Sequence, residues 1–153
     1  MAQKRTVLSL AVASALLLAI APTRAQELDA ETKARIEKAE AGPSEIDVSK
    51  YPAKLQDAYK VFSQKCSQCH KLSRPINSEF ALPEEWERYV KRMMRKPDSG
   101  IDAAVAKSIY ELLVYDASVR KKDLLDKKLA ALSAEERQTN TERLNKVKQT
   151  YAQ

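Results

Sequence analysis

Hydrophobic side chains recur along much of the chain with the three-to-four-residue spacing of an amphipathic helix. Within residues 53–69 the recurring positions are Leu55, Tyr59, Phe62 and Cys66. After Asp98-Ser99-Gly100 they are Ile101, Val105, Ile109, Leu112 and Leu113. Because residues at this spacing fall on one side of a helix, the pattern predicts two helices, each with an apolar face.

A further helix is predicted between these two. Pro83 suits the first turn of a helix, and Glu84 and Glu85 after it complement the positive end of the helix dipole. The helix should end by Lys96, because the residue before Pro97 is pushed out of helical geometry. Upstream of it, turn-forming residues interrupt any periodicity, so a loop is expected over residues 73–82.

The two ends of the remaining sequence are charged and less regular. Residues 26–52 are acidic and contain Gly42-Pro43-Ser44, which indicates a linker or N-terminal extension, with a short helix possible over 29–41. Residues 123–153 form a charged tail in which Ser133 and Glu136 match a capping box. Helical spacing continues at Leu144, Val147 and Tyr151. Such a helix either docks on the core, docks on another protein, or remains a solvated tail.

Composition favours an all-α fold and restricts the chemistry. Only 6% of the residues are aromatic, and helix-forming Ala, Leu, Lys and Glu dominate. The 153 residues suffice for one folded domain. The two cysteines and one histidine are too few for a closed zinc site, which uses about four such ligands, or for several disulfides.

The N-terminus carries the pattern of an export signal. Lys4 and Arg5 precede an apolar run from Val7 to Ala21, and Thr23-Arg24-Ala25 offers small residues for a cleavage site. We expect residues 1–25 to be removed after Ala25 and the product to be periplasmic, without a membrane span. The alternative is a retained N-terminal anchor, although the run is short for one.

The charge of the chain is concentrated in its middle. Residues 50–122 hold fifteen basic and nine acidic residues, whereas residues 26–49 hold three basic and seven acidic ones. A basic middle segment can steer an acidic partner. Because both signs are mixed and the chain carries an export signal, a nucleic-acid partner is not expected.

The strongest chemical signal is Cys66-Ser67-Gln68-Cys69-His70, a C-x-x-C-H sequence typical of covalent attachment of c-type haem. On one face of a helix, both thiols could add to vinyl groups of the porphyrin, and His70 could then bind the iron. Three other interpretations compete with this one. A redox-active C-x-x-C needs a βαβ setting, a disulfide between Cys66 and Cys69 would close a very small loop, and zinc lacks ligands.

The second axial ligand of the iron can be argued by elimination. A methionine thioether is a common partner of histidine, and beyond the export signal the chain contains only Met93 and Met94. Met93 falls on the same helical face as Trp86 and Val90, so Met93 is the predicted ligand. Water, a lysine or Met94 at this position remain alternatives, with Met93 serving only as core packing.

These segments together resemble single-haem class I cytochromes c over residues 53–118. Phe62 occupies the aromatic position four residues before the first cysteine of that family's N-terminal helix. The segment from Trp86 to Met93 is similar to a W-x-x-x-V-x-R-M pattern of small bacterial haem domains, in which the methionine binds the iron. The resemblance implies a compact cytochrome c-like helical fold around one haem c over residues 53–122, between the acidic linker and the helical tail.

The resemblance also implies one-electron transfer and not catalysis. Cys66 and Cys69 would hold the haem, and His70 and Met93 would bind the iron. Transient partners with acidic surfaces would dock on a basic ring formed by Lys60, Lys65, Lys71, Arg74, Arg88 and Arg92. Arg74 or Arg92 could pair with a haem propionate. Alternatives are a haem subunit of a larger redox enzyme or reaction centre, and a haem sensor with an open sixth site.

Overall fold

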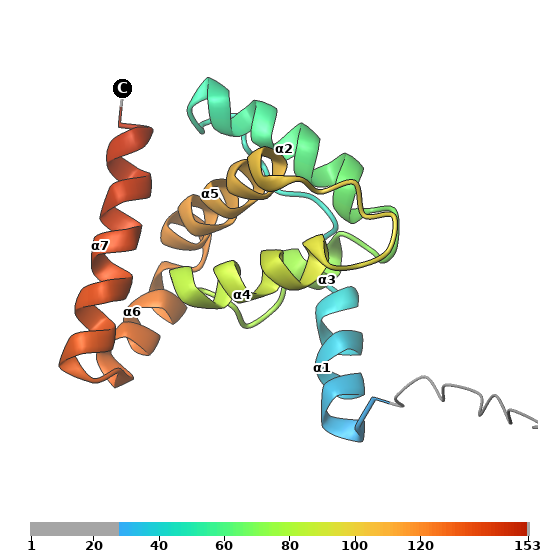
Figure 1. The fold of residues 1–153 in the computed structure, drawn as a ribbon. Coiled ribbons are helices and arrows are strands. Elements are labelled where there is room, and N and C mark those ends of the chain that lie inside the picture. The colour runs from blue at the N-terminus through green and yellow to red at the C-terminus, as the bar shows by residue number, and fades with distance from the viewer. Residues whose placement is uncertain (1–27, 153) are drawn as a thin grey trace, which may run out of the picture.

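The computed structural model describes residues 28–152, which form seven α-helices and no strand (Figure 1). In chain order they are α1 (Ala30–Glu40), α2 (Ala53–Cys66), α3 (Ser73–Ile76), α4 (Pro83–Met94), α5 (Ala103–Arg120), α6 (Lys122–Ala131) and α7 (Ala134–Thr150). The predicted all-α fold is confirmed for this part of the chain. The expected export signal lies outside the described residues. Within them, no helix combines the length and apolar character needed to cross a membrane.

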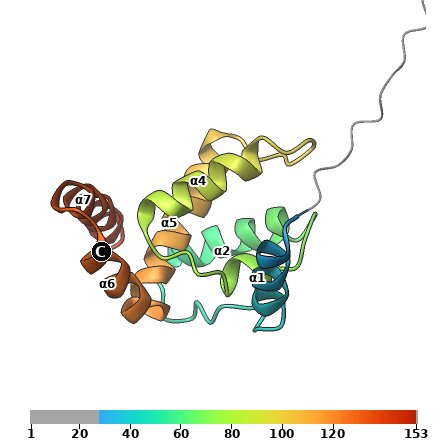
Figure 2. The ribbon, with the colours of Figure 1, turned by 90° about the horizontal axis from the view of Figure 1, so that it is seen from below.

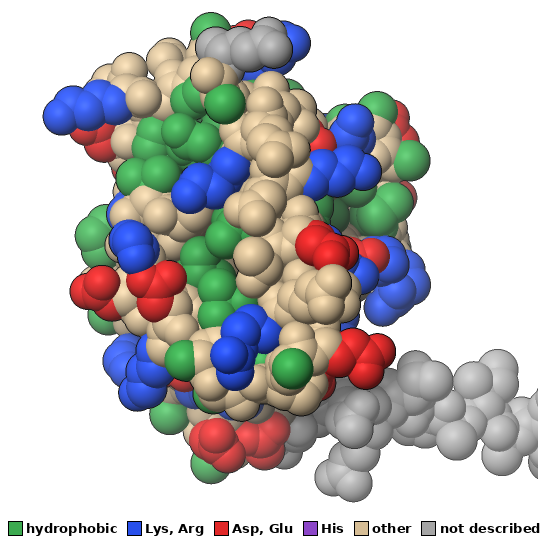
Figure 3. All heavy atoms as spheres, turned by 90° about the vertical axis from the view of Figure 1, so that its left-hand side faces the viewer, with side chains coloured by type: hydrophobic (Ala, Val, Ile, Leu, Met, Phe, Trp, Pro, Cys, Tyr) green, Lys and Arg blue, Asp and Glu red, His purple; other side chains and the backbone are tan. Residues whose placement is uncertain are grey.

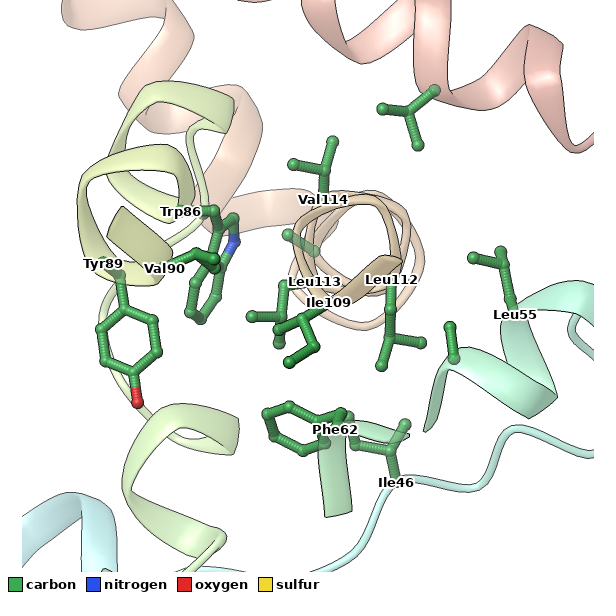
Figure 4. Packing of buried hydrophobic residues seen from close by; sticks show 14 of the residues in the cluster. Ile46, Leu55, Phe62, Trp86, Tyr89, Val90, Ile109, Leu112, Leu113 and Val114 are labelled. Atoms are coloured by element: carbon green, nitrogen blue, oxygen red, sulfur yellow. The ribbon is translucent and has the colours of Figure 1, made fainter. Parts of the chain in front are cut away.

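Helix α5 is the centre of the fold and packs against α2, α4, α6 and α7. Its buried side chains point in several directions, as expected for a helix that is covered on more than one side. Figure 4 shows Phe62 of α2 and Trp86 of α4 on different sides of α5. Both of these aromatic side chains are fully buried. The core thus forms between α5 and the helices that surround it.

The two terminal parts of the described chain lie at opposite ends of the molecule (Figures 1 and 2). Helix α1 packs on α3, whereas α6 and α7 pack on α5 and on each other, and α7 also reaches α4. The segment that joins α1 to α2 buries Ile46 and Tyr51 in the main core. Of the alternatives open for the C-terminal helix, the structure therefore has it docked on the core.

Most predicted helix boundaries are close to those observed. Asp29 caps α1 by accepting a hydrogen bond from the backbone N–H of Thr32 at 2.7 Å. The predicted capping box is formed, since Ser133 accepts from the N–H of Glu136 and the Glu136 carboxylate accepts from the N–H of Ser133. Helix α5 begins at Ala103, and Asp102 caps it by accepting from the N–H of Val105 at 2.8 Å.

Two predictions near the cysteines were wrong. Helix α2 ends at Cys66 and not at Cys69: the bond from the Ser67 N–H to the Ser63 carbonyl closes its last turn, and residues 67–69 form a turn. The expected loop over residues 73–82 contains the short helix α3. Pro75 is compatible with it, because the first turn of a helix does not need the N–H that proline lacks.

Candidate functional site

Cys66 and Cys69 occupy different environments, although they are three residues apart. Cys66 is the last residue of α2 and belongs to the buried core, whereas Cys69 is exposed in the turn that follows. The two cysteines therefore do not share a helical face, contrary to the sequence-based expectation. Burial, with a smaller effect of Cys69, raises the pKa of the Cys66 thiol to about 12. A buried thiol with a raised pKa is a poor nucleophile, which argues against a thioredoxin-like role.

His70 follows this turn and is held by a backbone carbonyl. Its Nδ1 atom lies 3.0 Å from the carbonyl oxygen of Lys71. Because a carbonyl can only accept a hydrogen bond, the contact assigns the ring proton to Nδ1. The lone pair of Nε2 is then available, and a backbone carbonyl bonded to the other ring nitrogen is a common way to orient a metal-binding histidine.

Tyr89 of α4 completes the surroundings of His70. Its hydroxyl lies 3.4 Å from His70 Nε2, and its own pKa is raised by burial. The guanidinium of Arg92 lies over the Tyr89 ring, 5.6 Å from the ring centre. Sequence reasoning did not identify Tyr89 as part of the site. The available signal was its position four residues before Met93, which places both on one face of α4.

The two methionines at the end of α4 point in different directions. Both side chains are half-buried against the core. Met94 lines a groove between α4, α5 and α7, together with Val90 and Val147. Met93 lies one helical turn beyond Tyr89, whose hydroxyl contacts His70. The helix geometry thus puts Met93, more than Met94, on the His70 side of α4.

The segment after His70 is tied to α1. The guanidinium of Arg74 donates from Nε to the Glu40 carboxylate at 2.7 Å, and its Nη2 atom also bonds this carboxylate. The side-chain amide of Asn77 donates to the carbonyls of Ala39, Pro43 and Ser73. Arg74, which the sequence suggested as a partner for a haem propionate, is therefore already paired with a carboxylate of the chain.

Only part of the proposed basic ring is free of internal ion pairs. Besides Arg74, Lys60 pairs with Asp57 at 2.8 Å and Arg88 with Glu84 at 3.2 Å. Among residues 28–152, no ion pair is found for the other three members of the ring: Lys65, Lys71 and Arg92. These three residues are the ones available to an external anion.

The residues present fit a covalently attached haem by their chemistry. A thioether sulfur is neutral, so the buried position of Cys66 suits it better than it suits a thiolate. The exposed Cys69 thiol is accessible, and His70 presents its Nε2 lone pair. Iron bound at this atom would replace the contact with the Tyr89 hydroxyl. Within the described residues, no group of three or more His, Cys, Asp or Glu side chains is arranged to hold a metal ion.

Comparison of the chain with protein-family models, curated proteins and solved structures finds no significant match. The assignment of a function therefore depends on the residues of this site.

Proposed function

We propose that the chain is an exported one-electron carrier with a cytochrome c-like fold and one covalently bound haem c. Thioether bonds to Cys66 and Cys69 would hold the haem, and His70 and Met93 would bind its iron. The observation that carries the proposal is the hydrogen bond between His70 Nδ1 and the Lys71 carbonyl. It orients a metal-binding nitrogen directly beside two cysteines at the spacing of haem attachment.

The iron would supply a reversible one-electron couple, and the protein would hold its ligands in place. The Lys71 carbonyl fixes the ring of His70, and the buried Cys66 anchors the attachment peptide to the end of α2. A thioether from Met93 would favour the ferrous state relative to a second histidine. The packing of Trp86 and Val90 against α5 supports the helix that carries this methionine. No substrate needs to bind the metal, so we propose no catalytic reaction.

Docking to an acidic partner would use the members of the basic ring for which no ion pair is found among residues 28–152. Lys65, Lys71 and Arg92 come from the segments that flank the candidate site. The Lys65 Nζ atom lies beside Gly100, 2.8 Å from the position a Cβ there would take, which places the end of α2 next to the turn before α5. Attraction between exposed charges of opposite sign speeds association and weakens with salt.

Replacing the two methionines separately tests this function. Met93→Ala should keep the haem attached but abolish the weak red absorption band that methionine-to-iron bonding gives in the ferric protein. Met94→Ala is the matched control, because it removes the neighbouring methionine, which lines the groove between α4, α5 and α7. The reduction potential should fall only in the first variant. Loss of the band in Met94→Ala alone, or no such band in the unmodified protein, would contradict the assignment of Met93.

A further inference from the structure

The N-terminus of α4 lacks an ordinary cap. Its N-cap residue, Leu82, has no side-chain acceptor, and Pro83 has no N–H to satisfy. The Glu85 carboxylate folds back and accepts from the N–H groups of Ala81 and Leu82, at 2.9 Å each. The first N–H of α4 that has no acceptor nearby in the sequence is thus that of Glu84, which needs an acceptor from another segment.

Asn140 of α7 supplies that acceptor. Its Oδ1 accepts from the Glu84 N–H at 3.2 Å, and its Nδ2 donates to the Glu136 carbonyl at 2.9 Å. The side chain is only 1% exposed. Because one end of the amide bonds a donor and the other an acceptor, its orientation is defined by both partners. A residue 56 positions away in sequence therefore performs the capping role that the local sequence leaves open.

Further contacts fasten the same half of α4 to the C-terminal helices. The Nζ atom of Lys128 lies 2.5 Å from the Glu85 carboxylate, and Arg143 lies 2.5 Å from that of Glu87. Burial acts to raise the pKa of Glu85, but the N–H groups of Ala81 and Leu82 and the Lys128 ammonium outweigh it and leave this pKa lowered. Figure 3 shows the surface at this end of the molecule, where charges of both signs surround hydrophobic side chains.

We propose that Asn140 is a positioning residue for α4, and that it helps to hold the Tyr89 and Met93 side of this helix against His70. A helix behaves as a short rod, so an anchor at its first turn restricts its rotation and tilt along its whole length. Without this bond, α4 would be held by its packing on α5 and by the partly exposed ion pairs of Glu85 and Glu87, which do not bond the backbone of its first turn. The part of the inference that concerns the bond between Met93 and iron rests on the proposed function.

The test compares two hydrogen bonds, one made by a residue of α7 and one by the residue that follows this helix. Asn140→Leu keeps the branching of the side chain and removes both its bond to α4 and its bond to the Glu136 carbonyl. Tyr151→Phe is the matched control, because it removes the bond from the Tyr151 hydroxyl to Glu111 of α5, at 2.6 Å, and leaves α4 untouched. Asn140→Asp separates the two bonds of this side chain, since it keeps an oxygen that can accept from the Glu84 N–H but loses the donor to the Glu136 carbonyl.

Two readouts are measured on the full exported protein. Loss of a cap is expected to speed amide exchange at Glu84 about tenfold in Asn140→Leu. The second readout is the pH midpoint at which the ferric protein, as the pH is raised, loses the absorption band of methionine-to-iron bonding. Asn140→Leu should lower this midpoint by about one unit. Asn140→Asp should slow exchange at Glu84 relative to Asn140→Leu, and Tyr151→Phe should show neither effect.

Unchanged exchange at Glu84 in Asn140→Leu would overturn the capping role. An equal fall in the pH midpoint in Tyr151→Phe would overturn the positioning role, because the effect would then reflect general loosening of α7. A colourless protein would overturn the proposed function and the iron-related part of this inference, while amide exchange would still decide whether Asn140 caps α4.

Discussion

Helix α1 and the α6–α7 pair are both charged extensions of the central helices, but they are attached by different forces. Helix α1 buries only Ala39 and is joined to the segment after His70 through Glu40 and the Asn77 amide. The α6–α7 pair buries Leu125, Leu144 and Val147 in the main core. Polar contacts thus attach one extension, and apolar burial supplemented by polar contacts attaches the other.

This difference indicates which extension the fold depends on. Apolar burial contributes most of the free energy of folding, while half-exposed ion pairs contribute little. The Glu40 and Arg74 side chains are 22% and 37% exposed, so their pair is partly screened by water. We therefore expect α1 to open locally without unfolding the protein and the α6–α7 pair to unfold together with it.

The largest expected effect follows from removing apolar contacts on each side. Leu125→Ala in α6 removes a side chain that is 2% exposed and should lower the free energy of unfolding by about 2–5 kcal/mol. Ile36→Ala in α1 removes a half-buried side chain and should cost less than about 1 kcal/mol. Urea unfolding followed by circular dichroism measures both. Equal losses of unfolding free energy in the two variants would mean that the fold depends equally on both extensions.

A smaller effect is expected when the polar attachment of α1 is removed. Asn77→Ala deletes an amide that reaches the carbonyls of Ala39 and Pro43, and should lower the free energy of unfolding by about 1–2 kcal/mol. Amide exchange should accelerate in α1 and stay unchanged in α7. Acceleration in both helices would contradict independent attachment.

The smallest effect concerns the pH dependence of the free energy of unfolding that arises from Lys121, the residue before α6. The Lys121 ammonium donates to the Ser78 and Phe80 carbonyls, and burial, with a smaller effect of Arg120, lowers its pKa from 10.5 to about 8. Between these values the unfolded chain binds more protons than the folded one, so stability should rise with pH.

From pH 8 to 9.5 we expect the free energy of unfolding of the unmodified protein to rise by about 1 kcal/mol relative to that of Lys121→Met, measured by urea titration. Comparison with the variant cancels the groups with raised pKa values, such as Tyr89, which act in the opposite direction. Parallel pH profiles in the two proteins would show that Lys121 does not carry this change.

Much of the fold could be predicted because its signals are local. The spacing of Leu55 and Phe62, and the position of Pro83 before two glutamates, are sufficient to place α2 and the start of α4. The end of α2 was missed because nothing in residues 67–69 forbids a helix. The burial of Ile46 and Tyr51 was also missed, since their segment has no periodicity and is held by distant contacts.

The same limit applies to the candidate site. Cys66, Cys69 and His70 are adjacent in sequence, so a short motif was enough to identify them. Three contacts that join distant segments could not be predicted from this motif. They are the contact of the Tyr89 hydroxyl with His70, the pairing of Arg74 with Glu40, and the hydrogen bond by which Asn140 caps α4. Such contacts depend on how the helices cross. They have no fixed separation in sequence, so a pattern search along the chain does not find them.

The intact mass of the purified, exported protein decides whether a haem is covalently attached to it. We expect a visibly coloured chain whose mass exceeds that of the polypeptide by one haem and keeps this excess after denaturation. Cys66→Ala together with Cys69→Ala should remove the excess, because no other cysteine is present. A colourless polypeptide with no added mass, purified from cells able to attach haem to other exported proteins, would contradict this attachment.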